Sequence, residues 1–122
     1  MSGFKIKSYR DLTVWQRAKA FAVETYRVTD TFPRREQYSL TDQIRRAAVS
    51  IPSNVAEGQI RRSDKIFANH LDIALGSSAE LDTQFEIALE VGYLKPENYE
   101  TLVTELQEIM KMLRGLLKAV SR

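Results

Sequence analysis

Cysteine is absent from this sequence of 122 residues, and histidine occurs only once, as His70. Without cysteine the chain forms neither a disulfide nor a thiolate metal site, and a reducing compartment such as the cytoplasm is the expected location. In di-iron helix bundles a glutamate stands three residues before each ligating histidine, but Phe67 occupies that position here. We therefore expect no metal and no cofactor, and we interpret His70 as a packing residue.

Long apolar runs are also absent. None approaches the roughly 20 residues that a membrane-spanning helix needs, and the first ten residues show no apolar segment followed by a cleavage site. The five glycines are scattered, so that neither a phosphate-binding loop nor a nucleophile elbow is present. We therefore expect no membrane association, no small-molecule substrate and no enzymatic activity.

Proline and glycine are scarce, with three and five residues, and apolar residues recur at intervals of three and four. This periodicity is typical of helices and indicates an all-α protein. Pro33 ends the first helix, Ser63 and Pro96 begin later ones, and Gly92 follows the end of the third. The short connections predict one domain, residues 1–122, folded as an antiparallel up-down-up-down four-helix bundle. The expected helices span about residues 12–30, 39–61, 64–91 and 96–120.

The apolar stripes of these helices predict the core. In the first helix the stripe runs through Trp15 and Tyr26. The residues expected at the centre of the bundle are Trp15, Ile44, Ala48, Ile51, Leu71, Leu81, Phe85, Leu106, Ile109 and Leu113. The last helix carries a second apolar row, Val103, Met110 and Leu117, beyond what one neighbour covers, which favours a homo-oligomer.

Charge is divided unevenly along the chain. Up to Ile66 there are thirteen Lys and Arg against seven Asp and Glu, and after it five against nine. The split indicates either a basic face for an anionic partner or complementary surfaces that pair within or between subunits. The candidate nucleic-acid-binding residues are Arg34, Arg35, Arg45, Arg46, Arg61, Arg62 and Lys65. In an antiparallel bundle the first and second connections lie at opposite ends, which argues against one compact basic patch per subunit.

Pro52 interrupts the second helix, where a kink is expected because proline cannot donate to the carbonyl of Ala48. It begins a motif that continues with Asn54, Glu57 and Gly58. We interpret this motif as structural, with Asn54 or Glu57 satisfying exposed backbone groups or a neighbouring subunit. Glu57 is also placed to pair with Arg61 one turn later.

Several segments together carry a family resemblance. They are Leu-Thr-Val-Trp-Gln at 12–16, Phe32-Pro33 with Glu36, Tyr38 and Leu40, the run from Gln43 to Gly58, and Ile-Ala-Leu-Gly-Ser-Ser-Ala-Glu-Leu at 73–81. The chain resembles the bacterial four-helix bundle proteins that include those encoded in intervening sequences of 23S ribosomal RNA genes. The resemblance implies a cytoplasmic bundle, often a ring-like pentamer, without an established activity. His70 and Asp72 depart from the family pattern, which has aromatic or apolar residues there.

A more distant similarity is to the accessory variability protein of diversity-generating retroelements. That protein is a basic pentamer that works with RNA and a reverse transcriptase, and its relevance to binding by this chain is an analogy of fold. Two hypotheses of function follow. The first is a homo-oligomeric adapter, pentameric by resemblance, that binds structured RNA or a ribonucleoprotein through the basic residues. The second is an oligomeric scaffold that binds only protein. A nuclease based on Arg62 and His70 ranks third, because their separation exceeds the spacing of the helical ribonucleases.

Overall fold

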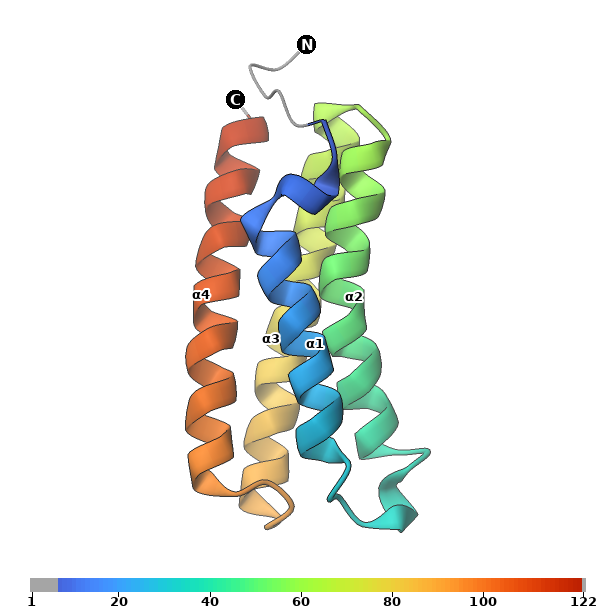
Figure 1. The fold of residues 1–122 in the computed structure, drawn as a ribbon, viewed down its shortest axis with the longest axis vertical. Helices are drawn as coiled ribbons and strands as arrows, with labels where there is room; N and C mark the ends of the chain where they lie inside the picture. The colour runs from blue at the N-terminus through green and yellow to red at the C-terminus, as the bar shows by residue number, and fades with distance from the viewer. Residues whose placement is uncertain (1–6, 122) are drawn as a thin grey trace.

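Four helices joined by short connections make up most of the computed structural model, which describes residues 7–121 (Figure 1). The helices are α1 (Thr13–Thr29), α2 (Leu40–Ile60), α3 (Asp64–Glu90) and α4 (Pro96–Val120). Two short 3₁₀ turns, η1 (Tyr9–Asp11) and η2 (Arg34–Glu36), precede α1 and α2. The prediction of no targeting signal concerned the first ten residues, and residues 1–6 lie outside the described part of the chain. Within residues 7–121, no helix combines the length and apolarity needed to cross a membrane.

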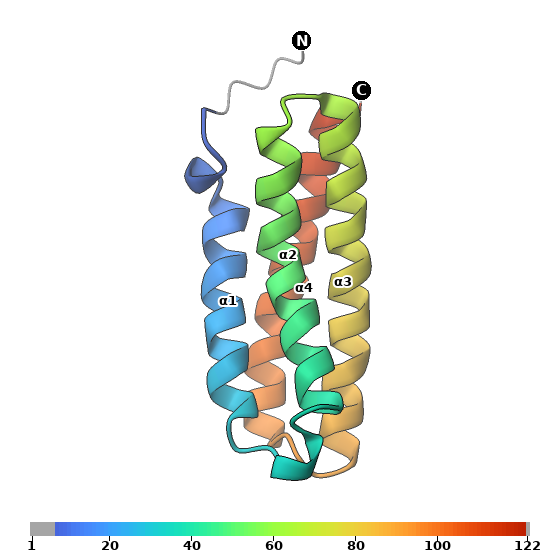
Figure 2. The ribbon, with the colours of Figure 1, turned by 90° about the vertical axis from the view of Figure 1, so that its right-hand side faces the viewer.

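Successive helices run in opposite directions around the bundle (Figures 1 and 2). α2 packs against α1 and α3, and α4 packs against α3 and α1. The α1–α2 and α3–α4 connections therefore share one end, while the α2–α3 connection lies at the other end with the start of α1 and the end of α4. The all-α four-helix fold predicted from the periodicity is confirmed.

The ends of α3 are fixed by local chemistry. The Ser63 hydroxyl accepts a hydrogen bond of 3.3 Å from the amide of Ile66, which satisfies one of the free donors at the helix start. At the other end Gly92 has a φ of 84°. The amide of Gly92 donates to Leu89 and that of Tyr93 donates to Ala88, which is the paired arrangement of a Schellman motif. This reversal turns the chain into α4.

α2 ends differently, because a side chain occupies the left-handed position. Arg62 has a φ of 55°, and its amide donates to the carbonyl of Gln59. In this conformation the Cβ of an L-residue lies too close to the backbone, which costs roughly 1–2 kcal/mol. The α2–α3 connection is therefore strained at a residue that carries a positive charge. α2 itself continues through Pro52 without a break.

Nine of the ten side chains predicted at the centre of the bundle are buried. The exception is Trp15, which is only partly buried and packs against the edge of the core. α1 is rotated from the predicted stripe, so that Phe21 lies inside and Tyr26 is 45% exposed. The core face of α1 also contains Thr25 and Thr29.

The two threonines are accommodated in the core because their hydroxyls are satisfied locally. Thr25 donates to the carbonyl of Phe21 at 2.8 Å, and Thr29 donates to the carbonyl of Thr25 at 2.7 Å. A buried hydroxyl with such a bond avoids the cost of an unpaired polar group. The prediction placed Trp15 and Tyr26 inside because it followed the spacing of apolar residues, and threonines do not enter that pattern.

The second apolar row of α4 is largely used within the subunit. Val103, Met110 and Leu117 are half-buried, and Met110 and Leu117 pack against the core. The sequence argument for an oligomer was that this row exceeds what one neighbouring helix covers. In the structure the row is not the main exposed apolar surface. Exposed apolar side chains occur instead on α1, α2 and α3.

Candidate nucleic-acid interface

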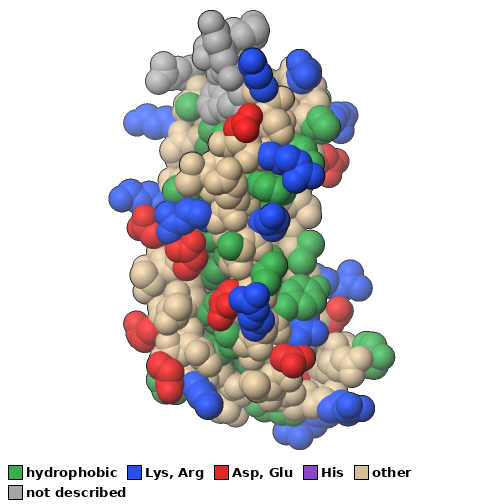
Figure 3. Space-filling model, viewed as in Figure 1, with side chains coloured by type: hydrophobic (Ala, Val, Ile, Leu, Met, Phe, Trp, Pro, Cys, Tyr) green, Lys and Arg blue, Asp and Glu red, His purple; other side chains and the backbone are tan. Residues whose placement is uncertain are grey.

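Basic side chains are spread over the surface. Figure 3 shows, on the face with α1 in front, that Lys and Arg occur from one end of the bundle to the other with acidic side chains between them. The seven candidate residues divide into three groups: one at each end of the bundle and one on the shaft of α2. The antiparallel topology causes this separation.

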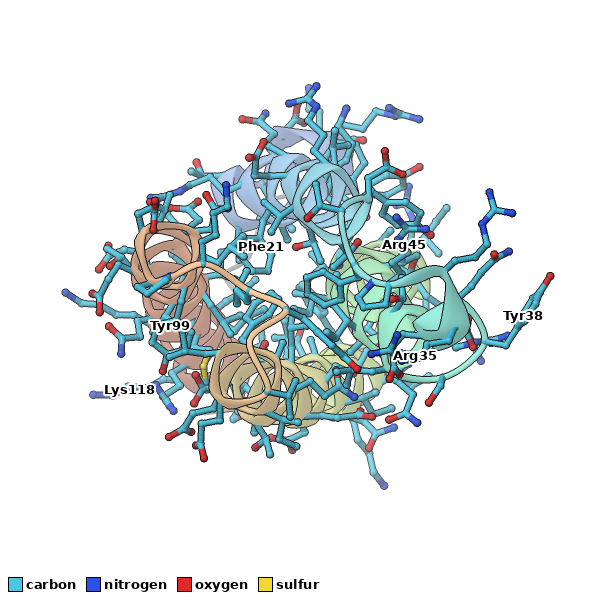
Figure 4. The ribbon with its side chains drawn as sticks, turned by 90° about the horizontal axis from the view of Figure 1, so that it is seen from below. Phe21, Arg35, Tyr38, Arg45, Tyr99 and Lys118 are labelled. Atoms are coloured by element: carbon cyan, nitrogen blue, oxygen red, sulfur yellow. The ribbon has the colours of Figure 1, made fainter. Side chains whose placement is uncertain are left out.

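The first group lies at the α1–α2 connection. Arg34 and Arg35 are exposed in η2, directly after Pro33, whose fixed φ of −56° directs the chain away from α1. Tyr38 follows them and is 88% exposed. In the end-on view of Figure 4, Tyr38 projects outward from this connection, with Arg35 nearer the bundle axis. Two cations and an aromatic ring are thus presented together.

Tyr38 is the residue that the sequence analysis missed as a candidate. It was recognised only as part of the family pattern. Successive bases stack on aromatic rings in proteins that bind unpaired nucleic acid. The available signal was its position two residues before a helix and three after an arginine pair.

The second group lies at the opposite end, at the α2–α3 connection. Arg61, Arg62 and Lys65 are all exposed. Within residues 7–121, neither these three side chains nor Arg34 and Arg35 form an ion pair. Five of the seven candidate cations are therefore free to contact a phosphate.

The third group, on the shaft of α2, is engaged inside the subunit. The guanidinium of Arg45 donates to the Thr29 hydroxyl at 2.9 Å and to the Tyr26 carbonyl at 3.2 Å, and lies 4.6 Å from the centre of the Tyr26 ring. Arg46 donates to Asp42 at 2.9 Å, and this hydrogen bond raises the pKa of Arg46. Arg45 thus ties the last turn of α1 to α2, and its cation is already paired.

The motif in α2 faces α3 through a chain of polar contacts. Asn54 donates to the carbonyl of Ser50 at 2.9 Å, and its carbonyl oxygen lies 2.9 Å from Nδ1 of His70. The hydroxyls of Ser50 and Ser77 are 2.8 Å apart. His70 and Asn54 therefore satisfy each other at the helix contact, and His70 occupies its unusual position as a half-buried polar residue.

Gly58 makes this contact close. A Cβ added at Gly58 would lie 2.6 Å from the Cβ of His70 and 3.0 Å from Phe67, which is closer than side chains approach each other. Glu57 lies 3.9 Å from Nε2 of His70 and does not form the expected ion pair with Arg61 within the described chain. Asn54 and Gly58 thus lie in the contact between α2 and α3.

A nuclease centre at His70 and a metal site have little support in the described residues. The side chain of His70 is only 13% exposed and is held by Asn54. Among residues 7–121 there is no group of three or more His, Asp or Glu side chains arranged to hold a metal ion. The ends of the bundle therefore carry the best candidates for recognition.

Comparison with known proteins gives a family match and several similar solved chains. The sequence profile described as 23S rRNA-intervening sequence protein matches residues 10–115. A crystal structure of a protein of unknown function from the S23 ribosomal protein family of Bacteroides thetaiotaomicron is similar to this chain, with a TM-score of 0.79 and 27% identity. The similarity covers 86% of this chain and 95% of that one. None of the curated protein sequences matches at a significant level.

Proposed function

Because the chain belongs to the 23S rRNA-intervening sequence protein family, we propose that it is a homo-oligomeric adapter without catalytic activity that binds structured RNA or a ribonucleoprotein through the ends of its bundle. The observation that carries the proposal is a set of five exposed cations in the two connections that form no ion pair within residues 7–121: Arg34, Arg35, Arg61, Arg62 and Lys65.

Arginine suits this role because its planar guanidinium presents several donors that match phosphate oxygens in a bidentate arrangement. Such contacts follow the nucleic-acid backbone and carry little sequence information. Tyr38 adds a ring on which an unpaired base beside a helix can stack. The expected target is therefore a folded RNA with both paired and unpaired segments.

Two or three cations at one end of a single subunit give weak binding. In a homo-oligomer each end is repeated by symmetry, and a partner that engages several copies at once gains affinity from the high effective concentration of the remaining sites. Assembly and RNA binding are thus linked in this proposal.

The alternative to this proposal is an oligomeric scaffold that binds only protein. Exposed apolar residues such as Val23 and Ile87 on the helices favour this alternative.

The test is a titration of labelled structured RNA at several salt concentrations. Three proteins are compared: wild type, Arg34→Glu with Arg35→Glu, and Arg61→Glu with Arg62→Glu. The control is Lys111→Glu with Arg114→Glu, which changes the net charge equally but lies along α4. Each neutralised phosphate contributes about −0.9 to the slope of log affinity against log salt for a B-form duplex and about −0.7 for a single strand, so loss of two contacts should make the slope shallower by between one and two.

A variant at a contacting end should bind at least about ten-fold more weakly, while the control stays near wild type apart from a general charge effect. Equal binding by all four proteins contradicts the proposal. Absence of binding by an assembled wild-type protein at low salt also contradicts it and leaves the protein-binding scaffold.

A further inference from the structure

One end of the bundle gathers cations from three separate segments. The start of α1, the α2–α3 connection and the end of α4 meet there, and we call it the terminal end (Figures 1 and 2). Its six exposed cations are Lys7, Arg10, Arg61, Arg62, Lys65 and Lys118. In the same stretches, residues 7–12, 59–66 and 117–121, the acidic residues are Asp11 and Asp64. None of the six cations forms an ion pair within residues 7–121, so this end carries an excess of positive charge.

Lys118 belongs to the terminal end because of the topology of the fold. α3 and α4 are antiparallel neighbours, so the first turn of α3, with Lys65, lies level with the last turn of α4, with Lys118. The sequence analysis did not name Lys118, because only the return of α4 to this end brings it near the α2–α3 connection. On the face shown in Figure 3, Lys and Arg side chains predominate around this end. The basic surface is therefore broader than the connection alone.

The terminal end suits the backbone of a double helix. A duplex carries one negative charge per about 1.7 Å of its axis, twice the density of a single strand. Its bases are paired, so recognition depends on contacts to the backbone and needs no aromatic ring. Tyr9 and Trp15 are half-buried at the start of α1, and the guanidinium of Arg10 lies 5.4 Å from the centre of each ring. The described part of this end thus offers cations, not a surface for stacking.

The opposite end, which we call the Tyr38 end, mixes charges of both signs. Arg34 and Arg35 precede Tyr38 in the α1–α2 connection. The same end also carries exposed carboxylates, those of Asp30, Glu90 and Glu97. Burial, followed by the negative charge of carboxylates on α3 and α4, raises the pKa of Tyr99 in the first part of α4. A duplex at this end would therefore bring its phosphates close to carboxylates.

An unpaired strand fits the Tyr38 end better. The side chain of Tyr38 is 88% exposed, and bases that are not held in a duplex stack on such rings. A single strand is also narrower than a duplex and has half its charge per unit length. It therefore reaches Arg34 and Arg35 with less repulsion from the neighbouring helices. The two ends thus favour different forms of RNA.

Within the described residues, the shaft of the bundle offers no continuous basic track between the ends. α2, which joins them, has 21 residues and is about 31 Å long. Between α1 and α2 lies an apolar groove of about 700 Å³, lined by residues that include Val23 and Val49. Arg45 is engaged with α1, and Arg17 pairs with Glu105 between α1 and α4. The exposed carboxylates of α3 include those of Asp72, Glu80 and Glu86.

We infer that the protein bridges two segments of RNA, with the backbone of a duplex at the terminal end and an unpaired strand at the Tyr38 end. The inference rests on the proposed function and deepens it, because it assigns a different form of RNA to each end. The ends face opposite ways and lie about 31 Å apart along α2, so a short RNA element occupies only one of them. Charges at this separation are largely screened, since the Debye length is about 10 Å at 0.1 M salt. The two segments therefore bind at the same time, whether they belong to one RNA or to two.

The test uses two short RNAs and untagged protein, with binding measured by fluorescence anisotropy. One RNA is a GC-rich duplex of about eight base pairs, which at roughly 3.4 Å per pair is shorter than α2. The other is an oligouridylate of about five nucleotides, within the range of site sizes of single-strand binders. Each RNA is titrated alone and then with a saturating amount of the other. We expect both to bind, and the affinity for either to change by less than about two-fold when the other is present.

Three variants with the same change of charge assign the ends. The terminal variant is Lys65→Glu with Lys118→Glu, the Tyr38-end variant is Arg34→Glu with Arg35→Glu, and the control is Lys19→Glu with Lys111→Glu on the shafts of α1 and α4. All six side chains are exposed, and circular dichroism checks the fold. We expect the terminal variant to bind the duplex at least about ten-fold more weakly and to keep its affinity for the oligouridylate. The Tyr38-end variant should show the reverse, and the control should stay near wild type for both RNAs.

Three outcomes overturn the inference. They are displacement of one RNA by the other, loss of both RNAs by a single end variant, and an end variant that binds its assigned RNA as tightly as wild type does. The first two leave the proposed function standing, because RNA still binds at an end of the bundle. Failure of the wild-type protein to bind either RNA at low salt refutes the proposed function and the inference together.

Discussion

The hydroxyl of Tyr93, in the α3–α4 connection, donates a hydrogen bond of 2.9 Å to a carboxylate oxygen of Glu36 in η2. The other oxygen of Glu36 accepts a bond of 3.3 Å from the amide of Leu40, the first residue of α2. The rings of Tyr93 and Phe32 also lie against each other, with their centres 5.7 Å apart. One carboxylate thus connects the two loops at this end and supports the segment that presents Arg34.

This contact makes stability depend on pH. The hydrogen bond from Tyr93, followed by that from the Leu40 amide, lowers the pKa of Glu36 below its ordinary value of 4.5. Its contribution to stability is therefore complete above about pH 4.5 and is lost as the pH falls through the lower pKa of the folded state. We expect Glu36→Gln to have a lower free energy of unfolding than wild type in urea at pH 7, and this difference in free energy to become smaller toward pH 3. Tyr93→Phe should behave in the same way. A difference that stays constant with pH would contradict this explanation.

Gly58→Ala should be destabilising because the new methyl group would overlap the Cβ of His70 at 2.6 Å. Overpacking of this kind typically costs about 1–3 kcal/mol. His70→Ala should not rescue the variant, since alanine retains the Cβ that clashes. The matched control is Gly115→Ala in α4, where an added Cβ meets nothing within 4 Å and the helix should gain about 0.5–1 kcal/mol. Urea unfolding that gave both substitutions the same sign would refute the close contact.

Arg62→Gly should stabilise the protein by about 1 kcal/mol, because glycine accepts a φ of 55° without the steric cost. The same substitution removes one of the free cations from the α2–α3 connection and should weaken RNA binding. Gly92→Ala, at a φ of 84°, is the reverse case and should lose about the same amount. Thermal unfolding of Arg62→Gly measures the gain in stability, and RNA titration of the same variant measures the loss of affinity. A variant that gains no stability would show that the position is not strained.

Tyr38→Ala tests the stacking role of the exposed ring. Loss of a base–aromatic contact costs about 1–3 kcal/mol per base, so binding to an RNA with an unpaired loop should weaken roughly five- to a hundred-fold. Binding to a fully paired duplex should change little, because it depends on the cations. Fluorescence anisotropy with the two RNAs makes the comparison. A similar loss for both RNAs would indicate that Tyr38 supports the loop and does not stack.

Much of the fold follows from the sequence because its signals are local. The interval of three and four residues predicted the helices, and Ser63, Gly92 and Pro96 act at the ends as their chemistry suggests. The rotation of α1 was predicted incorrectly. Burial of Thr25 and Thr29 depends on hydrogen bonds to carbonyls in the same helix, and apolar periodicity does not contain that information.

Less of the candidate site could be predicted from the sequence. The arginine pairs were visible, but only the packed structure shows that Arg45 lies on Tyr26 and that Arg34 and Arg35 form no ion pair within the described chain. The groove between α1 and α2 forms because these consecutive helices pack side by side, and Trp15 lines it because α1 is rotated. Contacts between segments that are distant in the sequence decide which charged side chains are free. Short-range sequence patterns do not predict these contacts.

An even number of antiparallel helices returns the chain to the end from which it started, so the start of α1 and the end of α4 lie at the same end as the α2–α3 connection (Figures 1 and 2). A tag or fusion partner on either terminus would therefore crowd Arg61 and Arg62 and leave Arg34 and Arg35 open. Immobilised through such a tag, the protein would present mainly its Tyr38 end to a ligand in solution. Attachment through an engineered cysteine in the α3–α4 connection would expose the opposite end, and because the natural sequence contains no cysteine, that attachment would be unique.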